Sequence, residues 1–365
     1  MDKDIYYATD KDLFDALASK KKVYTVSQLK DLCKKRNVFV SDKEEREDII
    51  EYFSELPHSV WDLITIRDTM KANTKTEKTT SIKLEGNEIE SNSVLEVLDE
   101  LKDTRNKKYN ENYNIISKDP NHIIVDIDYQ EIDYGSTRLK QKQERTARIE
   151  IEKNSSGETS IRLPANEKAN EIAEAFIKRI NNDKDNTVKP KKINLSIVKN
   201  EKLRTKFFIE LINNIPVLMI REVSSIHVNA FKNNEDNEEQ MDESKQQVLA
   251  KLQTAIFKGE NLLETQEYLD FEKKGFFITG ITWQAVNKDT KEICLIEAVF
   301  HNEDECTDFA YNIKGIYQQN NDGTYQKTLK PLEGIKRTEL SRQIEEKALQ
   351  IADTIIEECN IGATK

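Results

Sequence analysis

The hydrophobic period of the chain changes near residue 82, and this change limits the folds that the sequence can adopt. Before it, apolar residues recur at helical spacing. After it, "IIVDIDYQEIDY" (123–134) alternates, with Ile123, Val125 and Ile127 on one side. Helical spacing is typical of amphipathic helices, and strict alternation is typical of half-buried strands. We therefore predict an α+β protein with a small N-terminal helical domain followed by two antiparallel sheet-plus-helix modules.

The helical domain is predicted over residues 1–72. Thr25 or Ser27 is the expected N-cap of its second helix, and Pro57 follows the third. The four segments with helical spacing are "KDLFDALAS", "TVSQLKDLCKKR", "REDIIEYFSEL" and "SVWDLITIRDTM". The polar stretch "KANTKTEKTTS" (71–81) is then expected to be a linker or an exposed loop.

The first sheet module is predicted over residues 82–232. Alternating segments at 123–134, 147–153 and 159–164 are expected strands, and "SSG" at 155–157 is the expected hairpin turn between the last two. The helix "NEKANEIAEAFIKRI" follows, with Asn166 as its cap. "KKINLSIV" (strand), "EKLRTKFFIELINNI" (helix) and "VLMIREVSSIHVNAF" (strand) extend the module.

An acidic block separates this module from the second, which is predicted over residues 244–365. "NNEDNEEQMDE" (233–243) holds six acids and no base, a composition typical of a solvated linker. A helix at 244–257, two hairpins and a C-terminal helix of ~24 residues should follow. The second hairpin is expected about "NNDG" (320–323).

No catalytic or cofactor motif stands out. The sequence contains no G-x-x-x-x-G-K-[ST], no G-x-G-x-x-G and no G-x-S-x-G. Its four cysteines form no C-x-x-C pair, and no histidine lies at metal-ligand spacing from them. We predict no cofactor, no metal site and no catalytic residues, with the cysteines as free thiols.

Two clusters of cations stand out because the whole chain carries a net charge of −11. Seven cations and one acid lie between Lys20 and Arg36, and five cations and one acid lie between Arg138 and Arg148. Clustered cations bind polyphosphate mainly by releasing counterions. We predict nucleic-acid contacts by Lys20, Lys21, Lys22, Lys30, Lys34, Lys35, Arg36, Arg138, Lys140, Lys142 and Arg145. A charged, solubilising loop remains the alternative for the second cluster.

The stretch "YTVSQLKDLCKKRNVFVSDKEEREDIIEYF", from Tyr24 to Phe53, resembles the SAP or HeH helix–extension–helix motif, a small DNA-binding element. In that motif a Val-x-x-Leu helix leads through a short extended turn to a Ser and a second helix. Asn37 stands where the family has Gly. The residues that follow the family pattern are Val26, Leu29, Leu32, Val38, Val40, Ser41, Ile49, Ile50 and Phe53. The resemblance implies phosphate contact by Lys34, Lys35, Arg36 and Lys43.

The sequence leaves three functions open. The first is a non-enzymatic DNA-binding subunit of an intracellular complex, with phage defence or chromosome upkeep as its setting. The second is an adaptor or sensor that holds partner proteins. The third is a divergent metal-dependent nuclease that uses Asp126, Asp128, Glu150 and Glu152.

The N-terminus and the hydropathy of the chain predict where the protein is located. "MDKDIYYATDKD" has no apolar segment of a signal peptide, and no window approaches the ~20 apolar residues of a membrane span. We expect a cytoplasmic protein that has DNA and protein partners and does not bind a membrane.

Overall fold

The fold is taken from a computed structural model, and it belongs to the predicted α+β class. The described residues are 7–19, 23–69, 77–135, 138–154, 157–182, 187–231, 254–259, 262–320 and 322–363. The helices are α1 (Asp10–Ser19), α2 (Val26–Lys35), α3 (Arg46–Ser54), α4 (Val60–Thr69), α5 (Ser91–Tyr109), α6 (Arg138–Gln141), α7 (Glu167–Ile180), α8 (Glu201–Asn214), the 3-10 turn η3 (Leu262–Glu264), α10 (Gln266–Lys273) and α11 (Gly334–Ala363).

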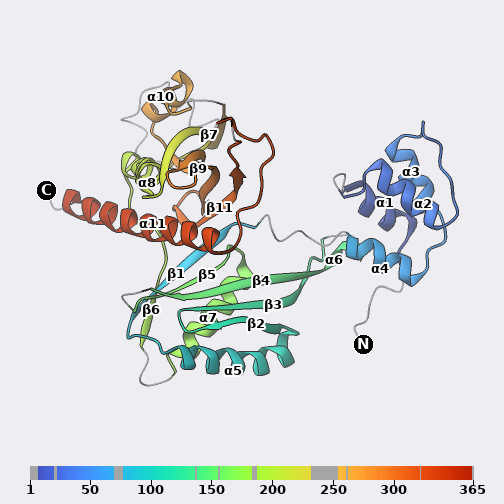
Figure 1. The fold of residues 1–365 in the computed structure, drawn as a ribbon, viewed down its shortest axis with the longest axis horizontal. Coiled ribbons are helices and arrows are strands. Elements are labelled where there is room, and N and C mark those ends of the chain that lie inside the picture. Colours follow the sequence, from blue (N-terminus) through green and yellow to red (C-terminus); the bar gives the residue numbers. More distant parts are fainter. Residues whose placement is uncertain are drawn as a thin grey trace, which may run out of the picture. The chain divides into compact units, whose positions relative to one another are not determined.

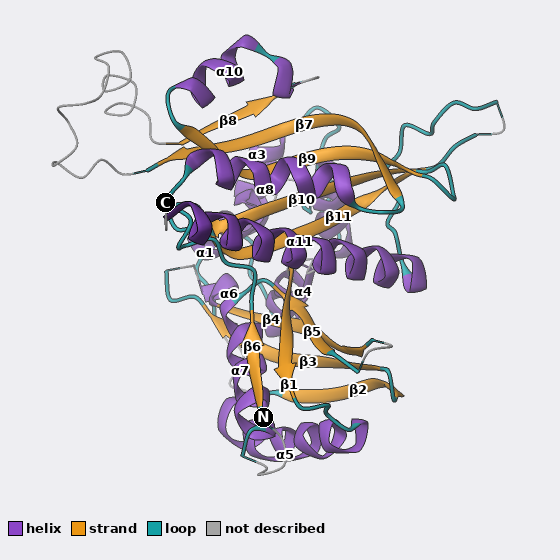
Figure 2. Ribbon diagram, turned by 90° about the vertical axis from the view of Figure 1, so that its left-hand side faces the viewer, coloured by secondary structure: helices purple, strands orange, loops and turns teal. Residues whose placement is uncertain are grey.

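The strands of the described chain form one antiparallel sheet of eleven members (Figures 1 and 2). They are β1 (Thr79–Gly86), β2 (Asn112–Asp119), β3 (His122–Ile132), β4 (Lys142–Lys153), β5 (Thr159–Pro164), β6 (Val188–Lys191), β7 (Leu218–Ala230), β8 (Thr254–Lys258), β9 (Phe276–Asn287), β10 (Ile293–Asn302) and β11 (Thr307–Tyr317). The order is β2-β3-β4-β5-β1-β11-β10-β9-β7-β8, and β6 pairs with β1.

Contacts divide the chain into two compact units. One holds Met1–Thr76, Leu95–Lys118 and Ile124–Arg148; the other holds Glu77–Val94, Asp119–Ile123 and Ile149–Lys365. These ranges differ from the predicted 1–72, 82–232 and 244–365. In particular, β7 from the predicted first module pairs with both β8 and β9 from the second. The acidic block 233–243 therefore does not separate two sheets.

The first unit contains the helical region, which we define as residues 7–69. Its four helices are those predicted, because one apolar face of each contributes to a common core. The buried members are Leu13, Ala16, Leu17, Tyr24, Leu29, Cys33, Ile49, Ile50, Phe53, Leu63, Ile66 and, from α6, Leu139. Thr25 caps α2 through a reciprocal capping box with Gln28.

The second unit has a larger core, built on β7, β9, β10 and β11 (Figure 2). Helix α8 packs against β7 and β9, and α11 packs against α8. The predicted apolar stripe of α11 is buried at Leu340, Ile344, Ala348, Ile351 and Ile355, whereas its last member, Cys359, is half-buried. The six apolar residues on the predicted stripe of α7 are buried as well, and Asn166 caps that helix.

Several predicted elements are wrong in detail. After Lys191, residues 192–197 form no strand, and 254–257 belong to strand β8 rather than a helix. The rest of the predicted helix 244–257 lies outside the described residues. The "NNDG" turn joins isolated bridges, Gln319 with Tyr325 and Ile316 with Lys330, rather than regular strands. Helix α11 has 30 residues, and α5 and α10 were not predicted.

Within the described part of the chain, no helix combines the length and the apolar character that a membrane span requires.

Candidate nucleic-acid interface

Helix α2 ends in a Schellman motif that turns the chain into an extended segment. Asn37 has a φ of 60°, in the left-handed region that Gly or Asn adopts most readily. The N–H of Val38 donates to the carbonyl of Cys33 (3.0 Å), and that of Asn37 donates to the carbonyl of Lys34 (2.9 Å). Asn37 thus adopts a backbone conformation that Gly also adopts readily.

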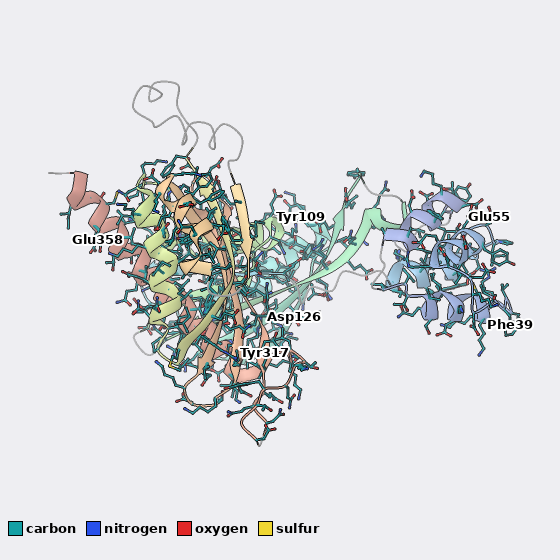
Figure 3. All side chains as sticks on the ribbon, turned by 90° about the horizontal axis from the view of Figure 1, so that it is seen from above. Phe39, Glu55, Tyr109, Asp126, Tyr317 and Glu358 are labelled. Carbon is teal, nitrogen blue, oxygen red and sulfur yellow. The ribbon has the colours of Figure 1, made fainter. Side chains whose placement is uncertain are left out.

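The extension, residues 38–41, has no regular hydrogen-bonded structure, and its side chains alternate in direction. Val38 and Val40 pack against the core of the helical region. Phe39 between them is 81% exposed (Figure 3). Phe39 is not among the predicted contacts, although the alternation of "VFV" places it opposite the two valines.

Three lysines near this turn are exposed. Lys34 and Lys35 lie in the last turn of α2, and Lys43 follows the extension. In the part of the chain that the structure describes, none of the three has an ion-pair partner. Lys30 differs, because its ammonium group lies 2.8 Å from Asp42 and lowers the pKa of that carboxyl by a hydrogen bond and by its charge. Asp42 is fully exposed, so this pair is weak.

Arg36 is engaged within the fold. Its guanidinium donates to Asp62 Oδ2 at 2.9 Å, to the ring of His58 at Nδ1 (3.1 Å) and to the carbonyl of Pro57. The other ring nitrogen of His58 lies 2.8 Å from the carbonyl of Phe53 and therefore carries the proton. Burial lowers the pKa of His58, and the charge of Arg36 lowers it further. Arg36 therefore ties the end of α2 to the start of α4.

The remaining predicted contacts are placed as follows. Lys20, Lys21 and Lys22 lie outside the described residues, as do the side chains of Arg138 and Lys140 in α6. Lys142 is half-buried at the start of β4, and Arg145 forms an ion pair with Glu131. Of these residues, the structure therefore describes only the side chains of Lys142 and Arg145.

The carboxylates of the nuclease alternative are held by other side chains. Asp126 forms a bidentate pair with Arg148 at 2.7 and 2.8 Å. Asp128 accepts from Thr146 (2.6 Å) and Asn114 (3.1 Å). Among the residues that the structure describes, no three His, Cys, Asp or Glu side chains are grouped so that they could hold a metal.

Glu150 and Glu152 bind Arg162, which is the centre of a buried ionic cluster in the second unit. Arg162 lies 2.7 Å from Glu150, 3.2 Å from Glu152 and 2.6 Å from Glu345 of α11. Tyr311 also donates to Glu345. Burial alone lowers the pKa of Arg162, but the carboxylates, Glu345 first, outweigh burial and raise it well above its ordinary value. No sequence motif marks this cluster, because its members come from β4, β5, β11 and α11.

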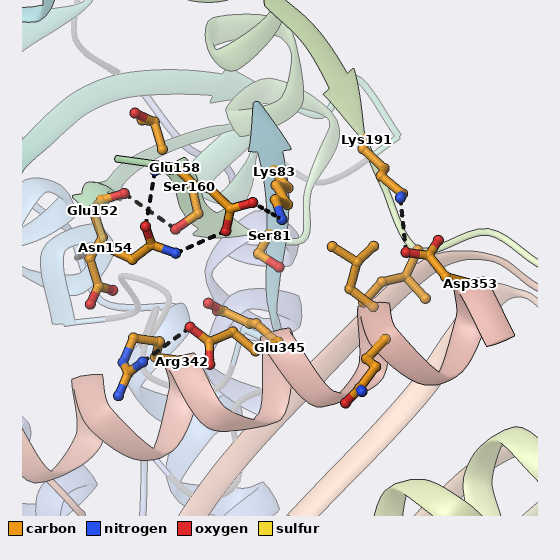
Figure 4. A pocket seen from close by; sticks show the side chains of 15 residues that line it. Ser81, Lys83, Glu152, Asn154, Glu158, Ser160, Lys191, Arg342, Glu345 and Asp353 are labelled. Atoms are coloured by element: carbon orange, nitrogen blue, oxygen red, sulfur yellow. Dashed lines mark hydrogen bonds and ion pairs between the residues drawn. The ribbon is translucent and has the colours of Figure 1, made fainter. Parts of the chain in front are cut away.

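Beside this cluster, a cavity of about 480 Å³ lies between α11 and the strands β1, β4 and β5 (Figure 4). Glu152 and Glu345 line it from opposite sides. Its three cations are all engaged by neighbouring carboxylates: Lys83 with Glu158 (2.7 Å), Lys191 with Asp353 (2.9 Å) and Arg342 with Glu346 (3.1 Å). The cations that line the cavity are therefore already neutralised by carboxylates of the fold.

Neither a scan of protein-family models nor a search of curated proteins gave a match to the chain.

Proposed function

We propose that the chain is a non-enzymatic DNA-binding subunit of a protein complex. The observation that carries the proposal is the Schellman end of α2, where the left-handed Asn37 turns the chain beside exposed lysines to which the described residues supply no ion-pair partner. Lys34 and Lys35 would contact successive phosphates, and Lys43 would add a contact across the extension. Lys30 would join them, because its exposed pair with Asp42 is easily exchanged for a phosphate.

The contribution of these lysines is mainly electrostatic. Each cation that meets a phosphate releases condensed counterions, so binding weakens steeply as the salt concentration rises. The acidic residues at the start of α3, Glu47 and Asp48, would lie away from the DNA. Local charge therefore matters more to this proposal than the net charge of −11.

The test is a salt series with labelled duplex DNA and the full chain. The logarithm of the binding constant should fall linearly with the logarithm of the salt concentration. The double variant Lys34→Ala, Lys35→Ala should bind more weakly and with a slope smaller by about 0.9 for each lost contact. Lys11→Ala is the matched control, because Lys11 is an exposed lysine of α1 that already pairs with Asp15. Absence of binding to both duplex and single-stranded DNA at about 50 mM salt, or an unchanged slope in the double variant, would reject the proposal.

A protein-docking role is the second candidate, and one observation favours it. Trp61 on α4 is 76% exposed, and large aromatic side chains often anchor protein interfaces. If this role holds, Trp61→Ala should abolish co-purification of a defined partner from the native host and leave DNA binding intact. A partner that is retained by the Trp61→Ala variant would count against it.

A further inference from the structure

The side chain of Phe39 has no packing role in the helical region. Val38 and Val40 pack against its core, whereas Phe39 extends away from it and is 81% exposed. Figure 3 shows Phe39 at the outer margin of the helical region. The packing of the two valines against the core fixes the backbone of the extension, so the Phe39 ring is presented on a supported segment rather than on a free chain end.

Cations flank this ring along the chain. Lys35 lies four residues before Phe39 and Lys43 four residues after it, and both are exposed. An exposed aromatic ring between cations is the arrangement by which proteins bind single-stranded nucleic acid, with bases stacking on the ring and phosphates meeting the lysines. In a duplex the faces of interior bases are covered by their neighbours, so a ring reaches them only if the stack opens.

From this arrangement we infer that Phe39 stacks on an unpaired base, so that the helix–extension–helix segment takes single-stranded nucleic acid in preference to a duplex. The inference rests on the proposed function and deepens it by naming the substrate class. Stacking is tolerant of sequence because every base has a π face, so the preference concerns strandedness rather than base identity. The contribution of stacking to the binding free energy does not depend on counterion release, whereas that of the lysine contacts does.

The experiment measures the affinity of the full chain for a labelled oligothymidylate of about 12 nucleotides and for a duplex of the same length. Wild type should bind the single strand more tightly. Phe39→Ala should weaken single-strand binding by about 5- to 150-fold, leave the salt slope unchanged and leave duplex binding within about twofold.

Two further variants separate stacking from apolar contact. Phe39→Leu keeps an apolar side chain without a π face and should lose the same affinity, whereas Phe39→Tyr should retain it. Trp61→Ala is the matched control, because Trp61 is an exposed aromatic of the same region whose neighbour Asp62 is acidic. It should bind as wild type does.

The outcomes distinguish the two proposals. No binding of either nucleic acid would overturn the proposed function together with this inference. Binding that is equal for both strand states, or insensitive to Phe39→Ala, would overturn the inference alone. Wild-type affinity of Phe39→Leu for the single strand would show that an apolar contact is enough without stacking. A loss of affinity in Trp61→Ala equal to that in Phe39→Ala would show that the effect is not specific to Phe39. Either result would overturn the inference.

Discussion

At the residue scale, Arg36 shows how a cation in a basic cluster can serve the fold. Its planar guanidinium donates to three acceptors of the fold, on Pro57, His58 and Asp62. The two preceding lysines, Lys34 and Lys35, point to solvent. A charge-reversal experiment that includes Arg36 would therefore break its hydrogen bonds to the start of α4 as well as any contact with DNA.

His58 predicts a pH dependence at this junction. Its pKa in the folded chain lies below the ordinary value of 6.5 because of burial and the charge of Arg36. The unfolded chain therefore binds more protons in this range, and the stability of the helical region should fall as the pH falls below 6.5 until the folded pKa is passed. Hydrogen exchange of α2 and α4 in the full chain, corrected for intrinsic rates, measures this. His58→Gln should flatten the dependence, and an unchanged profile would contradict the assignment.

At the element scale, helix α2 ends where it does because Asn37 accepts a left-handed backbone. Asn37→Gly should leave the stability within a few tenths of a kcal/mol, because Gly adopts this conformation freely. Asn37→Val should lower the free energy of unfolding of the helical region by about 1–2 kcal/mol. Thermal unfolding and hydrogen exchange of α2 provide the measurement. Equal stability of the Gly and Val variants would show that this turn does not depend on φ.

The buried cluster that joins α11 to the sheet gives a second prediction at this scale. Arg162→Met leaves the buried carboxylate of Glu345 without its partner and should cost about 3–5 kcal/mol. The double variant Arg162→Met, Glu345→Leu should recover a substantial part of that loss, because neither charge then remains buried alone. Denaturant unfolding of the four members of the cycle measures the coupling. Strict additivity of the two single changes would argue that the pair is not coupled.

The sequence predicts those elements whose apolar residues follow one period from end to end. The stripes of α7 and α11 are examples, since each repeats over several turns. Helix α5 was not predicted, because its buried apolar residues end at Leu101 and residues 102–108 are all polar or charged. The exposure of the lysines in the candidate interface can be predicted from their position on α2, but the hydrogen bonds of Arg36 cannot. His58 and Asp62 lie 22 and 26 residues away and reach Arg36 only through tertiary packing.

At the scale of the whole molecule, the helical region is not completed by the N-terminal segment alone. Leu139 of α6 is 1% exposed within its core, and α6 packs against α1 and α4. Leu139→Ala should destabilise the helical region by about 3 kcal/mol, whereas Leu139→Met should cost less than about 1.5 kcal/mol. Hydrogen exchange should rise in α1 and α4 and stay unchanged in β9 and β10. A uniform rise across the chain would contradict this local effect.

The pairing of β1 with β11 brings Thr79 beside Tyr311, and Thr80 donates to the carbonyl of Phe309 at 2.7 Å. On this edge of β1, Lys83–Gly86 pair with β6, but the Thr79 end must wait during synthesis for more than two hundred further residues before β11 leaves the ribosome. Until then the nascent chain presents an open strand edge, the kind of surface to which other chains add. Translation that stops before β11 should thus yield products that aggregate or recruit chaperones, even though the helices before β1 have already been made.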